Sequence, residues 1–367
     1  MKDLFFQIIR IAIGVKDGLQ FIPSEDDWQA CYDMALKQTL IGISFAGVNR
    51  LPAEQRPPRS LYLKWMGKVA KIQMQNEKIN ETAVRTREAL SNAGFYCCML
   101  KGQGVAQLYN SELVMLRQSG DIDMWIVPKE KMNIKNRRKK IRDFVNNVAP
   151  KSTILYHQVG IHLKNNVKFE IHFTPSWMNS PIKNWRLQRW FEGQIDSVMH
   201  HEVELTNGKK IPAPTQTFNE VFILQHIYRH LFGEGIGLRQ VMDYYFVLMH
   251  SNADNRTELV KTLRHLGLLR FAHALMWVMG ELFAMPRERM ICEPNEKEGR
   301  FILEEMMIAG NFGHYDERID RSKTTLLQLF LMRTSRNLRF ISYYPEEVIC
   351  TPIFKIWHFT CRKLHII

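Results

Sequence analysis

Apolar residues recur every three to four positions through the first quarter of the chain, a period that predicts helices. Ser24 with Asp27 three residues later matches a capping box and marks the start of one helix. The longest predicted helix runs from about Ser60 to Asn92, and Gly94 is its stop signal. The pattern therefore predicts an all-helical amino-terminal region, residues 1–92.

Between residues 93 and 214 the pattern changes to short apolar runs and to alternating polar and apolar positions, which predict strands. Asn165-Asn166 and Asn207-Gly208 are hairpin signals, each between two such strands. The predicted strands are Phe95–Leu100, Asp121–Val127, Leu155–Leu163, Val167–Phe173, His200–Leu205 and Lys209–Ile211. This region is therefore predicted to be a mixed α/β core.

From residue 215 onward the helical spacing returns. The predicted fold class is α+β, with a small mixed-sheet core at 93–214 flanked by the helical region 1–92 and by a carboxy-terminal helical bundle at 215–367. Within this bundle, helices are predicted at about 257–266, 268–283, 301–309 and 322–341, whereas 351–367 is assigned to no element.

The composition is that of a soluble globular protein, since the 367 residues are 46% hydrophobic and 24% charged. The formal net charge of +13 favours polyanionic ligands such as nucleotides, nucleic acid or an anionic membrane surface, although solubility alone is the other interpretation. Six cysteines without Cys-x-x-Cys spacing indicate free thiols in a reducing cytosol and argue against a cysteine zinc site. We therefore expect a cytoplasmic protein.

The amino terminus is apolar, but Gln7 and Arg10 interrupt it and Asp3 is acidic. This pattern favours an amphipathic first helix over a signal peptide. No stretch reaches the roughly 20 apolar residues that a membrane-spanning helix needs, so we expect no membrane span.

The strand predicted at 121–127 begins with two aspartates, Asp121 and Asp123, directly after a Ser-Gly turn. Successive strand residues point to opposite faces, so the two carboxylates share a face, about 7 Å apart along the strand. The same alternation places Glu170 and His172 on one face of the strand at 167–173. Carboxylates that project together suit a hard divalent cation, which takes oxygen ligands and often bridges to substrate phosphates.

These strands belong to a set of segments with a fixed order. Leu-Lys-Gly at 100–102 is followed by Arg-x-x-Gly-Asp-Ile-Asp at 117–123, by Glu-Ile-His at 170–172, and by a helical segment at 226–232 that runs on to 237–243. Together these segments resemble the bacterial family of uncharacterised nucleotidyltransferases, within the nucleotidyltransferase superfamily related to DNA polymerase beta. The resemblance covers roughly residues 80–250.

The resemblance implies a metal-dependent nucleotidyltransferase. Such an enzyme would move a nucleoside monophosphate from an NTP, expected to be ATP, to a hydroxyl acceptor on a small molecule, a protein or an RNA end. Asp121 and Asp123 would hold two Mg²⁺ (or Mn²⁺) ions. Glu170 would complete the acceptor-side metal site or act as general base. His172 would contact the acceptor or its metal, or would support the ligands from behind.

The resemblance also implies a phosphate site. Backbone N–H groups of Gly102 and Gly104 would cradle the triphosphate, with Gly120 before the aspartates, and Lys101 and Arg117 would balance the charge. The chain departs from the superfamily pattern here, because its first turn reads Lys-Gly-Gln-Gly in place of Gly-Ser or Gly-Gly. The serine that would contact phosphate is therefore missing.

Two pairs in the carboxy-terminal half are further candidates. His226 and His230 have the i, i+4 spacing of a zinc pair, but position 227 is not glutamate and no third ligand is evident, so buried structural histidines or histidines near bound nucleotide are favoured. Arg239 and Asp243 have the same spacing. They form either a helix-surface ion pair or a unit in which Arg239 reaches towards substrate phosphates and Asp243 orients it.

The helix predicted at 129–147 is very basic, with eight Lys or Arg and one acid between 129 and 142. It is either a solvated helix face or a track for RNA or another polyanion. The aromatic residues Trp177, Trp185, Trp190 and Phe191 either pack a helix onto the sheet or form a clamp for a base.

Two other functions compete with the enzyme. The first is a catalytically silent nucleotide- or nucleic-acid-binding protein that retains the fold, but three clustered acids would repel phosphate without metal. The second is kinase-like phosphoryl transfer, which is disfavoured because the chain lacks a Walker motif and a kinase His-Arg-Asp.

Overall fold

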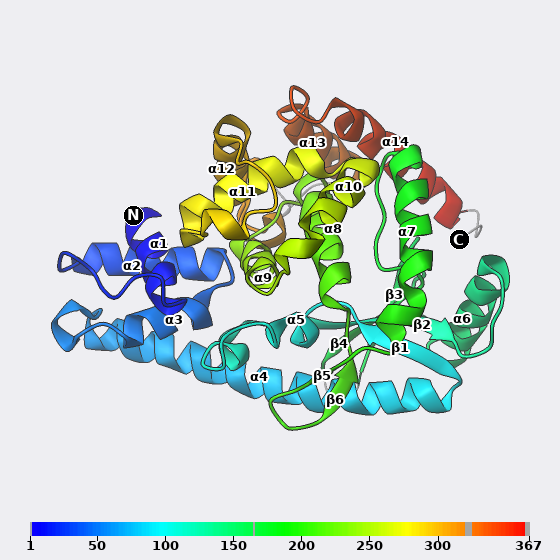
Figure 1. The fold of residues 1–367 in the computed structure, drawn as a ribbon, viewed down its shortest axis with the longest axis horizontal. Coiled ribbons are helices and arrows are strands. Elements are labelled where there is room, and N and C mark those ends of the chain that lie inside the picture. Colours follow the sequence, from blue (N-terminus) through cyan, green and yellow to red (C-terminus); the bar gives the residue numbers. More distant parts are fainter. Residues whose placement is uncertain (1, 164–165, 320–324, 364–367) are drawn as a thin grey trace. The chain divides into compact units, whose positions relative to one another are not determined.

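The computed structural model describes residues 2–163, 166–319 and 325–363, which form two compact units (Figure 1). The first unit comprises Met1–Met74, Leu108–Gln118 and Glu220–Ile349, and the second comprises Gln75–Gln107, Ser119–Asn219 and Cys350–Ile367. Neither unit is a continuous segment of the chain. The division into domains at 1–92, 93–214 and 215–367 stays a prediction.

The first unit is built from helices. The predicted capping box is present, because the Ser24 side chain accepts a hydrogen bond from the Asp27 backbone N–H and Asp27 reaches back to Ser24. The elements of this unit are α1 (Lys2–Ala12), α2 (Glu25–Lys37), α3 (Ile41–Asn49), η1 (Ala53–Gln55), the first part of α4 (Arg59–Asn92), η2 (Val114–Leu116), most of α8 (Gln216–Gly233), α9 (Leu238–Met249), η3 (Ala253–Asn255), α10 (Arg256–Leu266), α11 (Leu269–Phe283), η4 (Arg287–Arg289), α12 (Glu296–Ala309), η5 (Asn311–Gly313), α13 (Leu326–Leu338) and the start of α14 (Pro345–Lys363).

Three helices differ from their predicted bounds for local reasons. α12 begins five residues earlier than predicted because Asn295 caps it, accepting a hydrogen bond from the Glu298 N–H. α13 begins after a capping box formed by Thr325 and Gln328, and the predicted residues 322–324 lie outside the described part of the chain. α14 covers residues 351–363, to which the sequence pattern assigns no element, and it contains Pro352, although proline is rare in the interior of a helix. Residues 364–367 lie outside the described part.

The second unit contains a four-stranded mixed sheet with strand order β1-β2-β4-β3. β1 pairs antiparallel with β2, β2 parallel with β4, and β3 antiparallel with β4. The elements are the end of α4, β1 (Phe95–Met99), α5 (Gln103–Ala106), β2 (Asp121–Pro128), α6 (Ile134–Val148), β3 (Gln158–His162), β4 (Lys168–His172), α7 (Pro181–Met199), the hairpin of β5 (Glu202–Glu204) and β6 (Lys210–Pro212), and the end of α14. The predicted strands are thus present, with β3, β4 and β5 shorter than expected. Asn165 of the predicted turn lies outside the described residues.

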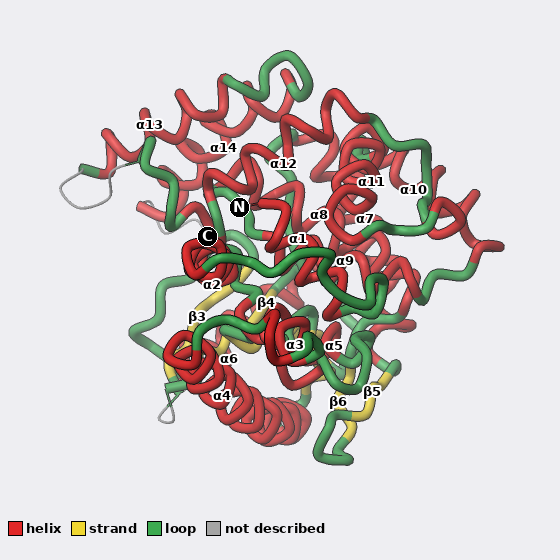
Figure 2. The backbone as a smooth tube through the Cα atoms, turned by 90° about the vertical axis from the view of Figure 1, so that its left-hand side faces the viewer, coloured by secondary structure: helices red, strands yellow, loops and turns green. Residues whose placement is uncertain are grey.

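The two faces of β2 have different functions in the fold. Ile122, Met124 and Ile126 enter the buried core with residues of α4 and α6, which lie on one side of the sheet (Figures 1 and 2). The alternate positions place Asp123 and Trp125 on the opposite face, where Trp125 packs against Phe191 of α7. This alternation directs the acidic side chains away from the core.

The basic helix begins later than its composition predicts. The Lys129 backbone N–H donates to the Gly94 carbonyl at 2.9 Å, which keeps this residue next to the sheet. Asn133 then caps α6, and its side chain accepts a hydrogen bond from the Asn136 N–H. The predicted fold class, a small mixed sheet with flanking helices, is confirmed. Among the described residues, no helix has the length and apolar character needed to cross a membrane.

Candidate metal centre

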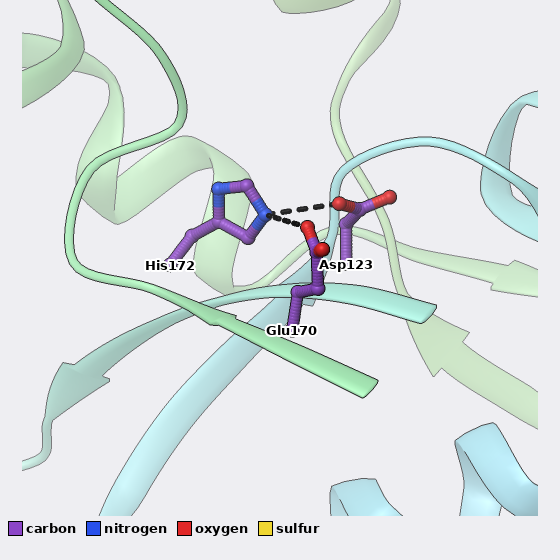
Figure 3. A group of neighbouring side chains, drawn as sticks. All are labelled: Asp123, Glu170 and His172. Atoms are coloured by element: carbon purple, nitrogen blue, oxygen red, sulfur yellow. Dashed lines mark hydrogen bonds and ion pairs between the residues drawn. The ribbon is translucent and has the colours of Figure 1, made fainter. Parts of the chain in front are cut away.

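Three side chains from the central parallel strands converge on one point in the second unit. Asp123 of β2 and Glu170 of β4 are partners in the strand register, and His172 follows two residues along the same face. One ligand atom from each of the three residues lies within 4.8 Å of the others (Figure 3). The structure thus brings Asp123, Glu170 and His172 together, through the parallel pairing of their strands.

Asp123 is the centre of this group. Its Oδ1 lies 2.9 Å from His172 Nε2, and its Oδ2 lies 3.1 Å from the Lys101 ammonium. Both Asp123 and His172 are 2% exposed. Glu170 is more accessible; its Oε2 lies 3.7 Å from His172 Nε2 and accepts a hydrogen bond from Gln158 at 2.6 Å. The aspartate is thus enclosed, whereas the glutamate retains access to solvent.

The neighbouring groups shift the pKa of Asp123 and the pKa of His172 in opposite directions. Burial raises the pKa of the Asp123 carboxyl, but the Lys101 ammonium and the His172 ring outweigh burial and hold this pKa well below its usual range. Burial lowers the pKa of His172, whereas its contacts with Asp123 and Glu170 raise it by more. The Asp123 carboxylate is therefore ionised, and the Lys101 ammonium balances its charge.

The donor set fits a divalent cation. Two carboxylates supply the oxygen ligands that Mg²⁺ and Mn²⁺ prefer, and an imidazole nitrogen beside them favours Mn²⁺ over Mg²⁺. His172 Nδ1 is buried and makes no hydrogen bond to the described residues. An ion at this point competes with Lys101 and His172 for Asp123.

Asp121 is not one of the three grouped ligands. It is half-buried at the start of β2, where its register partner is Lys168. That it shares a face with Asp123 stays a prediction from strand alternation. Gly120, which precedes it, is exposed.

The Lys-Gly-Gln-Gly turn lies beside β2. The Leu100 N–H donates to the Asp123 carbonyl at 3.0 Å, so the start of the turn is fixed at the aspartate itself. Gly102 has φ +60°, and a Cβ at Gly104 would lie 2.9 Å from the Met99 carbonyl oxygen, so both positions favour glycine. The Gly104 N–H donates to the Lys101 carbonyl at 3.2 Å and is therefore engaged within the turn.

A buried amide that the sequence analysis missed joins this turn to its surroundings. The Gln103 side chain accepts a hydrogen bond from the Ser119 hydroxyl at 2.7 Å and donates to Asn80 Oδ1 at 2.6 Å and to the Asn76 carbonyl at 3.3 Å. Gln103 therefore links α4 and the turn that carries Lys101 to the turn before β2. A polar residue between two glycines gave no signal of its own.

An aromatic cluster lies next to the group; its member Trp177 is one of the candidate aromatics, whereas the other members were not predicted. The His157 ring lies 5.3 Å from the His172 ring and 4.0 Å from the Trp177 ring, centroid to centroid. Tyr156 and Phe354 extend the cluster, and Trp177 stacks with Phe354 at 6.0 Å. Phe354 comes from α14, which the sequence pattern did not predict.

The other candidate aromatics have different surroundings. Phe191 packs against Trp125 and so joins α7 to the sheet, whereas Trp190 stacks on Phe218 at 5.3 Å and joins α7 to α8. Trp185 is 57% exposed, and the Arg189 guanidinium lies over its ring.

The basic helix α6 is only partly solvated. Arg137 is buried and pairs with Glu192, and the Arg138 guanidinium lies 5.8 Å from the Tyr156 ring centroid. Lys135 and Lys139 are exposed. The polyanion track along this helix stays a prediction.

Arg117 and Asp243 pair with each other inside the first unit. The Arg117 guanidinium donates to both Asp243 carboxylate oxygens at 2.7 Å, and the Tyr109 hydroxyl donates to the same carboxylate at 2.7 Å. Asp243 is 4% exposed, so the interpretation of a helix-surface ion pair with Arg239 is wrong. The Arg239 guanidinium donates to the Gln118 carbonyl at 2.7 Å.

His226 and His230 also lie in the first unit. Their ring centroids are 4.3 Å apart, His226 is buried, and His230 Nδ1 lies 3.1 Å from Glu234 Oε2. Neither histidine belongs to a group of three potential metal ligands within the described part of the chain. Their place near a nucleotide stays a prediction.

Comparison with known proteins gives one match. A family model described as "Uncharacterised nucleotidyltransferase" matches residues 24–284. No curated protein and no solved structure matches the chain.

Proposed function

Because the chain belongs to the uncharacterised nucleotidyltransferase family, we propose that it transfers a nucleoside monophosphate from an NTP, with ATP the expected donor, to a hydroxyl acceptor. The observation that carries the proposal is the convergence of Asp123, Glu170 and His172 on adjacent parallel strands. We further propose a place in the superfamily related to DNA polymerase beta and a cytoplasmic, bacterial setting. The core of the activity would lie in residues 93–214.

Asp123, Glu170 and Asp121 would hold Mg²⁺ or Mn²⁺, with His172 as a nitrogen ligand or as support for Asp123. A bound ion would stabilise the triphosphate charge and lower the pKa of the acceptor hydroxyl. The Asp123 carboxylate is fixed in place, because Lys101 contacts one of its oxygens and His172 contacts the other. Asp121, at the more open end of β2, would approach the donor.

In the proposed reaction the acceptor oxygen bonds to the α-phosphorus, the bond from this phosphorus to the bridging oxygen breaks, and pyrophosphate leaves. Glu170 would take the acceptor proton. Its side chain is 24% exposed, and Gln158 holds one of its oxygens through a 2.6 Å hydrogen bond. A restrained but accessible carboxylate suits a general base, since it must meet an acceptor that arrives from solvent.

Lys101 would contribute positive charge to the triphosphate. Its ammonium lies 3.1 Å from Asp123 and is carried by the same turn as Gly102, so a phosphate group near this turn is within reach of both. Once another cation neutralises Asp123, the Lys101 side chain is released to pair with phosphate. The Arg117–Asp243 pair, in contrast, is self-neutralising and is proposed to stabilise the first unit rather than to bind substrate.

The cluster of His157, Trp177, Tyr156 and Phe354 would provide a stacking surface for the nucleobase or for an aromatic acceptor. It borders His172 directly, and base–aromatic stacking is worth about 1–3 kcal/mol per base. Because every base presents a π face, stacking here would not select among bases.

One observation favours the silent binding protein as second candidate. The Lys101 ammonium balances the charge of Asp123 without metal, so the acidic group is less repulsive to phosphate than the sequence alone implies. In that case the site would bind a nucleotide without turnover.

Incubation with α-³²P-ATP and γ-³²P-ATP, Mn²⁺ or Mg²⁺ and candidate acceptors, including RNA, tests the proposal. We expect label transfer from the α position only, and loss of transfer in Asp123→Ala and Glu170→Gln. Glu204→Gln, an exposed acid on β5, is the matched control and should retain activity. Transfer from the γ position, or full activity in Asp123→Ala, would contradict the proposal. Metal-independent nucleotide binding with no transfer of either label would favour the silent protein.

A further inference from the structure

A pocket lined by three arginines lies in the first unit, beyond the segment matched by the family model. Its volume is about 480 Å³, which is within the range of small-molecule sites. The lining residues are Arg318, Leu331, Met332, Ser335, Arg336 and Arg339. All but Arg318 lie on α13 or directly after it.

Two of the arginines are paired with carboxylates. Arg318 donates to both oxygens of Glu305, at 3.1 and 2.9 Å, and to both oxygens of Asp316, at 2.7 and 2.8 Å. Arg339 shares Glu305, with its Nε 2.9 Å from Oε1. Glu305 and Asp316 are therefore already engaged, and the pocket keeps an excess of positive charge.

Arg336 has no such partner. Its side chain donates to the Leu231 carbonyl at 2.8 Å and to Asn337 Oδ1 at 2.8 Å, both neutral acceptors. No carboxylate of the described residues lies within ion-pair distance of its guanidinium, although the residue is only 5% exposed. Glu305 and Asp316 are engaged by Arg318 and Arg339 and do not contact Arg336 directly, so the charge of this buried cation is incompletely compensated. This arrangement favours an anion from outside the chain.

The electrostatics agree with this geometry. Burial is the main cause that lowers the pKa of Arg336, and Arg318 and Arg333 also lower it. Asp316 and Glu305 oppose this effect, and the resulting pKa is about 10. A bound anion would reverse this effect, because it compensates the charge that burial disfavours.

We propose that this pocket binds a small phosphate-bearing ligand through Arg336 and Arg339. A guanidinium presents a planar fork of donors that matches the oxygens of a phosphate group. Arg336 uses Nε and Nη2 for its protein contacts, which leaves Nη1 for a ligand, and Arg339 uses Nε, which leaves both outer nitrogens. The side chains of Leu331 and Met332 would contact the remainder of the ligand.

The phosphate group can come from a soluble compound or from a lipid headgroup. The second source is relevant because Leu327 and Leu331 on α13 are 66% and 55% exposed. The proposal does not depend on the metal centre or on nucleotidyl transfer.

Isothermal titration of the full chain with pyrophosphate and with AMP, in EDTA, tests the proposal. EDTA removes metal-dependent nucleotide binding at the metal centre. We expect saturable binding that weakens at least about tenfold in Arg336→Gln, the range expected for loss of one charge-assisted contact. Flotation with phosphatidylcholine vesicles that contain or lack phosphatidic acid then distinguishes a lipid headgroup from a soluble phosphate. If the ligand is a lipid headgroup, the protein floats only with vesicles that contain phosphatidic acid, and added pyrophosphate prevents this flotation.

Arg336→Gln also alters contacts with Leu231 and Asn337 and can impair folding, so two further variants carry the test. Ser335→Glu places a negative charge in the pocket, and Arg339→Gln removes a half-exposed cation; both should weaken binding. Arg264→Gln, an exposed residue on α10, makes the same charge change elsewhere and should leave binding unchanged. Absence of binding to both soluble phosphates and vesicles, or equal affinity in wild type, Ser335→Glu and Arg339→Gln, would overturn the proposal.

Discussion

Replacing Gln103 by leucine should destabilise the second unit, because this buried amide joins three elements. Its oxygen accepts from Ser119, and its nitrogen donates to Asn80 and to the Asn76 carbonyl. Leucine has a similar size but offers neither donor nor acceptor. The change therefore removes hydrogen bonds while leaving the volume nearly unchanged.

The magnitude follows from these contacts. Three hydrogen bonds at about 1 kcal/mol net each give a loss of about 3 kcal/mol in the free energy of unfolding. Asn80 is 2% exposed, so its Oδ1 has no access to water that would replace the lost bond. The unpaired Asn80 oxygen increases the loss, whereas burial of the leucine side chain reduces it, so the expected value stays near about 3 kcal/mol.

Urea-induced unfolding of the full chain, followed by tryptophan fluorescence, measures this loss. Gln107→Leu is the matched control, because the Gln107 side chain is half-buried and donates only to the Gln103 carbonyl at 3.0 Å. We expect the control to lose about 1 kcal/mol or less. If Gln103→Leu also loses no more than this, the three hydrogen bonds do not hold the turn in place and our reasoning is refuted.

Three further predictions concern other parts of the structure. Glu170→Gln should weaken Mn²⁺ binding about tenfold or more, as measured by titration calorimetry, because a neutral amide is a poor ligand for a hard cation; unchanged affinity would place the ion elsewhere. Tyr109→Phe should lower the free energy of unfolding by about 1.5–3 kcal/mol, since its buried hydroxyl donates to the charged Asp243; an unchanged urea midpoint would contradict this. Gly42→Ala should lower the melting temperature, because its Cβ would lie 2.2 Å from a backbone carbonyl oxygen, and an unchanged or higher melting temperature would contradict this. Gly67→Ala, with nothing within 4 Å of the added Cβ, should stabilise by about 0.5–1 kcal/mol, and a lower melting temperature would contradict this.

Strand alternation was the most informative sequence signal. It predicted that Ile122 and Met124 face the core and that Glu170 and His172 share a face, because the period of two in a strand is fixed by backbone geometry. It also placed β1, β2 and β4 close to their observed bounds. The parallel pairing of β2 with β4 was beyond this signal, since register between distant strands is set by tertiary contacts.

The contacts of individual polar residues were not predictable. Arg117 was expected to bind phosphate because it is positively charged, but it pairs with Asp243, which lies far away in the sequence. Lys101 was expected near phosphate and lies against Asp123. The Gln103 contacts and the approach of Phe354 to Trp177 also depend on packing between segments that no local pattern connects.

The register between β2 and β4 has a consequence for the order in which the protein forms. Asp123 and His172 are separated by 49 positions, and a slip of one residue would turn Glu170 to the opposite face. Capture of a metal ion at the proposed site would therefore require that this long-range pairing be complete. A nascent chain that has not yet emerged beyond residue 172 would lack the site, so under this proposal uptake of Mn²⁺ during synthesis would report the moment at which the central strands join.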